Sequence, residues 1–226
     1  MSRKYFFTIV FLIFCSCINA QPFDYEDSLK TFPNLNAKSS EKSSEDYMYI
    51  AIGHFDGKRY EQCLKNLDMA IQINDNETLT DILYYYRAVT FVQLEKDSMA
   101  IIQLDSAIIF NRKKVKYLSL RGDLHIKTEQ WDKAIADFQS ILELDPTNEP
   151  ARLQTGAALQ KKGQFKEALL TYDEIIKNNP QSADAYRLKG LLYLQAAVPD
   201  KGCEFLKKAA ELGSESARES AIRYCK

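Results

Sequence analysis

The clearest pattern in the sequence is a pair of apolar stretches at helical spacing, separated by a short polar break, that recurs from Ser44 onward. In residues 115–148, apolar side chains recur three and four positions apart over 118–126 and again over 134–144, on either side of Thr128-Glu129-Gln130. Such spacing is typical of amphipathic helices. It predicts two helices joined by a tight turn, a helix-turn-helix hairpin.

The hairpin pattern repeats itself at an offset of 34 residues. Residues 115–148 and 149–182 align without a gap, and the same frame extends back to 81–114 and forward to 183–216. A further copy, 44–77, is followed by a three-residue insertion. The matching positions in the two most similar units are Gly122 and Gly156, Ala134 and Ala168, Phe138 and Tyr172, Pro146 and Pro180. Copies in one frame predict an array in which each unit packs on its neighbours.

Small residues at fixed positions explain how the two helices of a unit approach each other. The first helix carries one of them and the second helix carries another, while large aromatic side chains fill the space beside these contacts. Pro146 and Pro180 lack an amide hydrogen and restrict the preceding residue, so each ends a helix. The small positions are Ala51, Ala88, Gly122, Gly156 and Gly190 in the first helices, and Cys63, Ala100, Ala134, Ala168 and Gly202 in the second.

The five units resemble the tetratricopeptide repeat (TPR) family. Units 115–148 and 149–182 match its pattern closely, whereas the other three are degenerate: Arg112 and Ser214 replace the closing proline, and Gly202 replaces an alanine. The resemblance implies an all-α fold, an α-solenoid of five hairpins over 44–77, 81–114, 115–148, 149–182 and 183–216. Residues 217–226 are expected to form a capping helix over the last hairpin.

The N-terminal residues have a different composition. Arg3 and Lys4 precede an apolar run of about ten residues, and Ile18-Asn19-Ala20 ends in a small residue, which is the layout of a secretory signal peptide over 1–20. Cleavage after Ala20 is the favoured interpretation, with lipidation of Cys17 as the alternative. Residues 21–43 show no sustained period and are interpreted as a flexible leader. We therefore expect an exported protein, in a bacterial periplasm or at the outer envelope surface.

Little in the sequence indicates catalysis. The formal charge of -1 gives no reason to expect nucleic-acid binding. Spacings that bind metal or phosphate, or that position a nucleophile, are absent, so no cofactor, metal or catalytic residue is assigned. His54 and His125 share one repeat position and are interpreted as packing residues. Arg121 is expected to pair with Asp137 across its hairpin, because a charge between helices needs a partner.

The cysteines that remain after signal cleavage have different expected roles. Cys63 occupies a small buried position and is interpreted as a core thiol. Cys203 lies early in the second helix of the last hairpin, and Cys225 ends the cap. These two ends meet if the cap packs antiparallel to that helix. Export permits a disulfide, so we expect a Cys203–Cys225 bond that holds the cap in place.

In the TPR family, first helices line a concave groove in which ligands usually lie. The resemblance therefore implies a groove for a protein or peptide, apolar at its N-terminal end and polar in its middle. An alternative is that the leader covers this apolar end. The leading hypothesis is an exported interaction scaffold without enzymatic activity; the alternatives are a structural subunit of an envelope complex and, third, an enzyme with an unrecognised site. The candidate groove residues are Met48, Ile52, Phe55, Tyr85, Val89, Val92, Asp123, Lys127, Gln160, Lys161, Arg187 and Leu191.

Overall fold

The computed structural model describes residues 42–225, which belong to one compact unit, Lys42–Lys226. The signal peptide, most of the leader and the lipidation site at Cys17 fall on residues 1–41 and lie outside the described residues. Over residues 42–225 the chain forms eleven α-helices and one 3-10 helix, with no strand.

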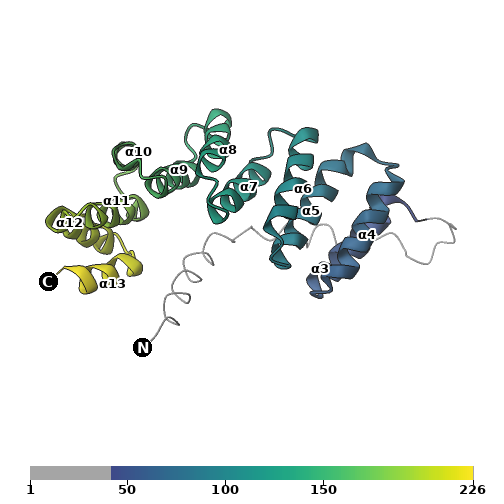
Figure 1. Ribbon diagram of the computed structural model, residues 1–226, viewed down its shortest axis with the longest axis horizontal. Helices are drawn as coiled ribbons and strands as arrows, with labels where there is room; N and C mark the ends of the chain where they lie inside the picture. Colours follow the sequence, from purple (N-terminus) through teal and green to yellow (C-terminus); the bar gives the residue numbers. More distant parts are fainter. Residues whose placement is uncertain (1–41, 226) are drawn as a thin grey trace. The chain divides into compact units, whose positions relative to one another are not determined.

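The α-helices pair as five consecutive hairpins followed by a single helix (Figure 1). This confirms the expected all-α solenoid. The 3-10 helix η2, Glu77–Leu79, lies in the insertion after the first hairpin, so α5 begins at Thr80. The last helix begins at Glu215, two residues before the segment assigned to the cap. The hairpins are α3 Ser44–Asp56 with α4 Tyr60–Ile73, α5 Thr80–Gln93 with α6 Asp97–Phe110, α7 Val115–Lys127 with α8 Trp131–Leu144, α9 Glu149–Lys161 with α10 Phe165–Asn178, and α11 Ala183–Gln195 with α12 Pro199–Glu211; α13 is Glu215–Tyr224.

The small residues lie where the two helices of a hairpin touch. A Cβ atom built on Gly122 would stand 2.7 Å from Cζ of Phe138, and one on Gly156 would stand 2.5 Å from Cε1 of Tyr172. A Cβ on Gly190 would meet the backbone carbonyl of Gly202 at 2.9 Å. All three distances are shorter than real Cβ contacts, so a larger residue would force a neighbour to shift: an aromatic ring at Gly122 and Gly156, and the backbone at Gly190.

The turn inside every hairpin has the same backbone conformation. One residue in each turn has a positive φ, between 56° and 86°, and the residue after it donates its amide to the first helix, as Gln130 does to the carbonyl of His125 at 2.7 Å. This is the left-handed ending common at helix C-termini. Only the fourth hairpin uses glycine there; the residues are Lys58, Glu95, Glu129, Gly163 and Ala197.

Side chains of neighbouring hairpins pack together in common hydrophobic clusters. The second helix of each hairpin contacts the first helix of the next, from α4 with α5 through α12 with α13. Tyr117 of α7, for example, is completely buried in the cluster formed by Ala88, Leu104 and Ala107 of the preceding hairpin. Its hydroxyl donates to Asp81 of α5 at 3.1 Å, so this large side chain leaves no polar group unpaired.

Ion pairs repeat at the junctions between hairpins. Arg121 Nε donates to Asp137 Oδ2 at 3.0 Å, which confirms the expected pair, and its Nη1 lies 2.6 Å from Asp105 Oδ1 of the preceding hairpin. At the junction between the third and fourth hairpins, Gln139 and Thr155 occupy the positions that hold an acidic and a basic residue at the other junctions. The corresponding pairs at other junctions are Arg87 with Asp68, at 3.0 Å, and Lys189 with Asp173.

The last helix, α13, is held by a disulfide and by packing. Cys203 of α12 and Cys225, directly after α13, form a disulfide with a Cα–Cα distance of 5.5 Å. Ala217 of α13 is buried against Leu206 and Ala209 of α12. Cys63 is a free, buried thiol 3.3 Å from the Thr90 hydroxyl. The structure thus contains the cysteine pair that the sequence suggested, while its redox state in the cell stays a prediction.

Candidate interaction surface

The candidate groove residues all lie on the first helices of the hairpins. Within the described unit, α3 contacts α5 and α9 contacts α11, so successive first helices are neighbours at both ends of the array. We call the twelve residues together the first-helix surface. They are Met48, Ile52 and Phe55 of α3; Tyr85, Val89 and Val92 of α5; Asp123 and Lys127 of α7; Gln160 and Lys161 of α9; and Arg187 and Leu191 of α11.

The α3 part of this surface is more buried than expected. Met48 is only 7% exposed and packs in the core cluster of Ala51 and Leu67. It is therefore a core residue in this structure and is not available to a partner. Ile52 and Phe55 are half-buried against the same cluster, so each leaves part of its side chain open.

The α5 part is aromatic, and Lys116 of α7, a cation that the sequence did not single out, lies over one of its rings. The ring of Tyr85 lies 5.0 Å from that of Tyr117, and Nζ of Lys116 stands 4.5 Å from the centre of the Tyr85 ring. Burial raises the pKa of Tyr85 and lowers the pKa of Lys116. Lys116 lies seven residues before Asp123 on α7, a two-turn spacing that places both on one helix face. This spacing is the feature of the sequence that could have identified Lys116 as part of the first-helix surface.

Asp123 is the only carboxylate among these twelve residues. It is half-buried, and across residues 42–225 no hydrogen bond or ion pair engages it. Burial raises its pKa to about 6. At the same repeat position the other hairpins have Ile52, Val89, Ala157 and Leu191. A partly desolvated carboxylate without a partner destabilises the fold and attracts a cation.

The remaining polar residues of the surface mostly have partners within the chain. Nζ of Lys127 lies 2.7 Å from Asp97 Oδ2, and Nη2 of Arg187 lies 3.1 Å from Asp184 Oδ1. Gln160 donates to Gln195 at 2.7 Å and accepts from the Tyr172 hydroxyl at 3.4 Å. Lys161 is exposed, and Leu191 is half-buried against the last core cluster. These internal contacts reduce what Lys127, Gln160 and Arg187 can offer a ligand.

The two histidines differ although they share a repeat position. His125 is 4% exposed, its Nδ1 has no partner, and burial lowers its pKa. His54 is half-buried and accepts a hydrogen bond from Nε of Arg59 at 2.9 Å. No group of three or more metal-binding side chains occurs in residues 42–225. His125 is therefore a buried packing residue, whereas His54 lies near the surface and is held by Arg59.

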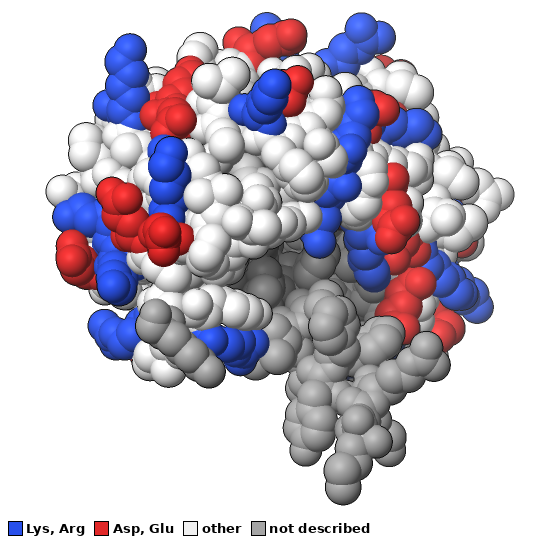
Figure 2. Space-filling model, turned by 60° about the vertical axis from the view of Figure 1, so that its left-hand side comes forward, with Lys and Arg blue, Asp and Glu red and all other residues white. Residues whose placement is uncertain are grey.

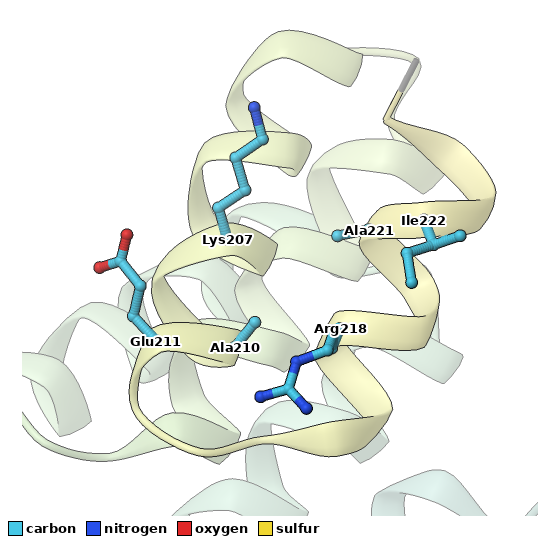
Figure 3. Close-up of a pocket in the computed structure, with 6 residues that line it drawn as sticks. All are labelled: Lys207, Ala210, Glu211, Arg218, Ala221 and Ile222. Atoms are coloured by element: carbon cyan, nitrogen blue, oxygen red, sulfur yellow. The ribbon is translucent and has the colours of Figure 1, made fainter.

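A hollow of about 420 Å³ opens between α12 and α13 at the C-terminal end (Figure 3). Its sides are Lys207, Ala210 and Glu211 of α12 and Arg218, Ala221 and Ile222 of α13. The hollow is open and shallow, and its charged side chains carry both signs. It lies outside the first-helix surface, and its residues show no arrangement that would select a particular ligand.

The charges on the visible face are mixed. Figure 2 shows lysines and arginines beside aspartates and glutamates around an uncharged area. This agrees with the formal net charge of -1 and with the ion pairs between hairpins. Long-range attraction of an oppositely charged partner therefore has little to act on, and recognition depends on local contacts. None of the described helices is both long and apolar enough to cross a membrane.

Comparison with known proteins agrees with this geometry. Residues 125–192 match the family model for the tetratricopeptide repeat. The paired helices, the 34-residue frame and the small-residue contacts continue the same pattern on both sides of the matched residues. The chain thus contains tetratricopeptide repeats over residues 125–192, and its described part is an α-solenoid of helix-turn-helix hairpins.

The curated relatives are longer than this chain. It is 28% identical over 157 residues to the DnaJ homolog subfamily C member 7 homolog of Schizosaccharomyces pombe, covering 67% of this chain and 32% of that protein. It is 23% identical over 201 residues to the Hsp70-Hsp90 organizing protein of Triticum aestivum, covering 84% of this chain and 32% of that protein. The chain therefore spans about a third of the length of these relatives.

Solved structures share the fold over most of the chain. One is YrrB, described as a TPR protein with an unusual peptide-binding site, with a TM-score of 0.65 and 22% identity over 80% of this chain and 92% of that one. Another is MamA, with a TM-score of 0.64 and 17% identity over 77% of this chain and 98% of that one. At these identities the likeness establishes the fold alone.

Proposed function

We propose that this chain is an exported, non-catalytic scaffold that binds a protein or peptide along its first-helix surface. Asp123 is the observation that carries this proposal. Its carboxylate has no partner in the described part of the chain and replaces an apolar residue at a position where burial makes a charge costly. A ligand with a lysine or arginine side chain would supply the missing cation.

Apolar and aromatic groups on α5, part of the same first-helix surface, define the rest of the ligand. Val89, Val92 and Tyr85 of α5 are half-buried and present part of their side chains. Partly exposed apolar groups and one carboxylate on the same surface suit a segment that carries both a basic and an apolar residue. The names of the similar proteins support a binding role, since YrrB is described with a peptide-binding site and other relatives as Hsp70-Hsp90 organizing proteins.

Export is the second part of the proposal. It is supported by the signal-peptide layout of residues 1–20 and by the Cys203–Cys225 pair, because disulfides persist in oxidising compartments. Cell fractionation followed by N-terminal sequencing tests it. A mature chain that begins at Gln21 indicates simple cleavage, a chain that begins at a lipid-modified Cys17 indicates the tethered form, and an uncleaved cytoplasmic chain contradicts export.

The binding surface is tested by site-specific crosslinking in cells. A photoreactive amino acid replaces Tyr85, which faces the first-helix surface, and in a matched strain it replaces Lys166, an exposed residue of α10. We expect a discrete crosslinked partner from position 85 and none from position 166. Adding Asp123→Asn to the position 85 strain should reduce the yield, because the carboxylate that attracts the basic side chain is lost.

Equal capture at positions 85 and 166 would contradict binding at this surface. An unchanged yield with Asp123→Asn would leave a ligand at the surface but remove the basic residue from its description. The folded state of each variant is checked by circular dichroism, since a loss of helicity would also abolish capture.

A second candidate function is a structural subunit of an envelope complex. Exposed apolar side chains on second helices favour it, among them Ile109 at 70% and Leu170 at 69% exposed. Gentle purification separates the candidates: a structural subunit co-purifies with other polypeptides in constant proportion, whereas a scaffold with a transient ligand is recovered without them.

A further inference from the structure

The connection between the second and third hairpins is basic. Residues 111–114 join α6 to α7, and three of them are the cations Arg112, Lys113 and Lys114. All three side chains are exposed, and across residues 42–225 no ion pair or side-chain hydrogen bond engages any of them. Neighbouring like charges repel one another. The loop therefore holds positive charge that the described part of the chain does not neutralise.

This charge is particular to one connection. The other connections between the described helix pairs, and the one before α13, contain no lysine or arginine, and two of them contain acids. They are residues 74–79, 145–148, 179–182 and 212–214. Hairpins of this fold therefore join without basic residues, so the packing of α6 against α7 does not explain the three cations.

Two exposed apolar side chains precede the loop. Ile109 and Phe110, the last residues of α6, are 70% and 59% exposed. The ring of Phe110 stacks on that of Tyr84 of α5, with 5.9 Å between the ring centres, which holds it beside the loop. The equivalents of Ile109 in the other hairpins are all polar, so the fold does not require an apolar residue there. They are Gln72, Glu143, Lys177 and Glu211.

A fourth cation continues the charge onto α7. The ammonium group of the exposed Lys116 lies 4.5 Å from the centre of the Tyr85 ring, and no carboxylate of residues 42–225 pairs with it. Burial, and after it the charge of Lys114, lowers the pKa of Lys116. Asp81 acts in the opposite direction, but it is buried and accepts a hydrogen bond from the Tyr117 hydroxyl at 3.1 Å. The positive field of the loop therefore extends to the first turn of α7.

Cations directly beside exposed apolar side chains suit the surface of an anionic bilayer. Lysine and arginine side chains reach lipid phosphates, while phenylalanine and isoleucine enter the boundary between head groups and acyl chains. A nucleic acid fits less well, because proteins bind its phosphates with cations along a stripe or groove, and the connections on both sides of this loop have none. An acidic protein would use the charges but leave Ile109 and Phe110 without a partner.

We propose that the end of α6 and the loop after it form a peripheral membrane contact for anionic phospholipid. Its cations bind the lipid phosphates and its two apolar side chains enter the lipid surface. We call this set the basic patch: Ile109, Phe110, Arg112, Lys113, Lys114 and Lys116. Each basic side chain at an anionic surface strengthens binding roughly fivefold, so the attachment is weak and reversible.

Cosedimentation with lipid vesicles tests this contact. The chain used begins at Gln21, which keeps the compact unit Lys42–Lys226 and removes the apolar run of residues 5–14. We expect it to bind vesicles of phosphatidylcholine with about one third phosphatidylglycerol at about 1 mM lipid, and to bind pure phosphatidylcholine at least about tenfold more weakly. Salt at about 0.5 M should release it, because screening then acts within about 4 Å.

The role of the loop is measured by Arg112→Gln/Lys113→Gln/Lys114→Gln. This variant removes three cations at exposed positions without touching the core, and it should bind anionic vesicles at least about 50-fold more weakly. Circular dichroism checks that its helicity is unchanged.

The matched control is Lys65→Gln/Lys166→Gln/Lys177→Gln, which changes the net charge equally at exposed positions on α4 and α10. It should weaken binding by less than about threefold, because these cations lie outside the basic patch. A natural chain that does not bind anionic vesicles, that binds neutral vesicles as tightly, or that is affected equally by both triple substitutions would overturn the proposal.

The role of the apolar side chains is measured by Ile109→Gln/Phe110→Asn. Both new residues occur at the equivalent positions of other hairpins, Gln72 and Asn178, so the fold should be kept. All cations remain, and binding to anionic vesicles should weaken at least about fivefold because nothing enters the lipid. Unchanged binding would overturn lipid as the partner, since an acidic protein or a nucleic acid needs the charges alone.

Discussion

Asp123 has a side chain that the repeat position does not favour. The four equivalent residues are apolar, and burial raises the pKa of Asp123 to about 6 because no partner in the described residues stabilises its charge. Residues that reduce stability without a compensating contact are characteristic of functional sites. The same side chain should therefore limit the stability of the free protein and support binding.

Asp123→Asn should increase stability at neutral pH and decrease binding. The folded-state pKa of about 6 lies above the ordinary value of 3.8, so the contribution of Asp123 to stability is fully present below about pH 4 and is lost as the pH rises through 6. One pKa unit corresponds to about 1.4 kcal/mol, and partial exposure reduces the effect. We expect the variant to gain about 1–2 kcal/mol in free energy of unfolding above pH 7 and almost nothing at about pH 4. Urea denaturation at both pH values measures this.

The matched control is Glu143→Gln, which removes a carboxylate from an exposed position on α8. It should leave stability unchanged within about 0.5 kcal/mol at both pH values. If Asp123→Asn behaved in the same way, the carboxylate would be well solvated and its role in attracting a basic ligand would lose its physical basis.

At the scale of the element, the distance between the two helices of a hairpin is set by single small residues. Gly190 faces the backbone of Gly202, whereas Gly122 faces the ring of Phe138, which can move. Gly53 of α3 has open space around it, with nothing within 4 Å of a Cβ atom. Glycines of similar helical position should therefore respond in opposite ways to the same substitution.

Gly190→Ala should destabilise the protein and Gly53→Ala should stabilise it. Alanine is favoured over glycine in a helix by about 1 kcal/mol, which is the expected gain at position 53. At position 190 the new methyl group would lie 2.9 Å from the Gly202 carbonyl, and we expect a net loss of about 2 kcal/mol as α11 and α12 separate. Thermal denaturation of both variants measures this. A stabilising Gly190→Ala would show that the helices separate at almost no cost.

At the scale of the whole molecule, the main contacts between helices of residues 42–225 lie within one hairpin or between neighbouring hairpins. Stability is then approximately a sum of hairpin and junction contributions, and the two ends are largely independent. The Cys203–Cys225 disulfide lies at one end, where α13 buries little besides Ala217. The bond therefore matters most for the helix that packing alone holds weakly.

Cys203→Ser/Cys225→Ser should destabilise the C-terminal end alone. The bond closes a loop with a sequence separation of 22 residues, for which the loop-closure model gives about 3 kcal/mol. Hydrogen exchange should become faster in α13 and α12 and stay unchanged in α3 and α4, which serve as the control within the same molecule. Equal acceleration at both ends would contradict nearest-neighbour coupling, and no acceleration at all would indicate that α13 is held by packing.

Periodicity in the sequence was sufficient to predict the fold. A 34-residue frame with small residues at two fixed positions is compatible only with helices that pack closely in pairs. The reason is that each helix packs against a helix of its own hairpin or of the next hairpin. The Arg121–Asp137 pair could be predicted for the same reason, since both residues belong to one hairpin. What the sequence determined by itself is therefore the local order of helices, turns and pairs.

The tertiary structure decided which side chains remain available. Met48 fits the surface pattern but is buried. Lys116 of α7 lies over the ring of Tyr85 of α5 only because these two helices come close to each other in the fold. The exposure of Met99 and Ile109 could not be predicted either. An apolar residue on a helix is expected to be buried as long as the residues around it are unknown. The burial of a side chain depends on contacts from other hairpins, which a repeat pattern does not specify. The burial that raises the pKa of Asp123 could not be predicted for the same reason.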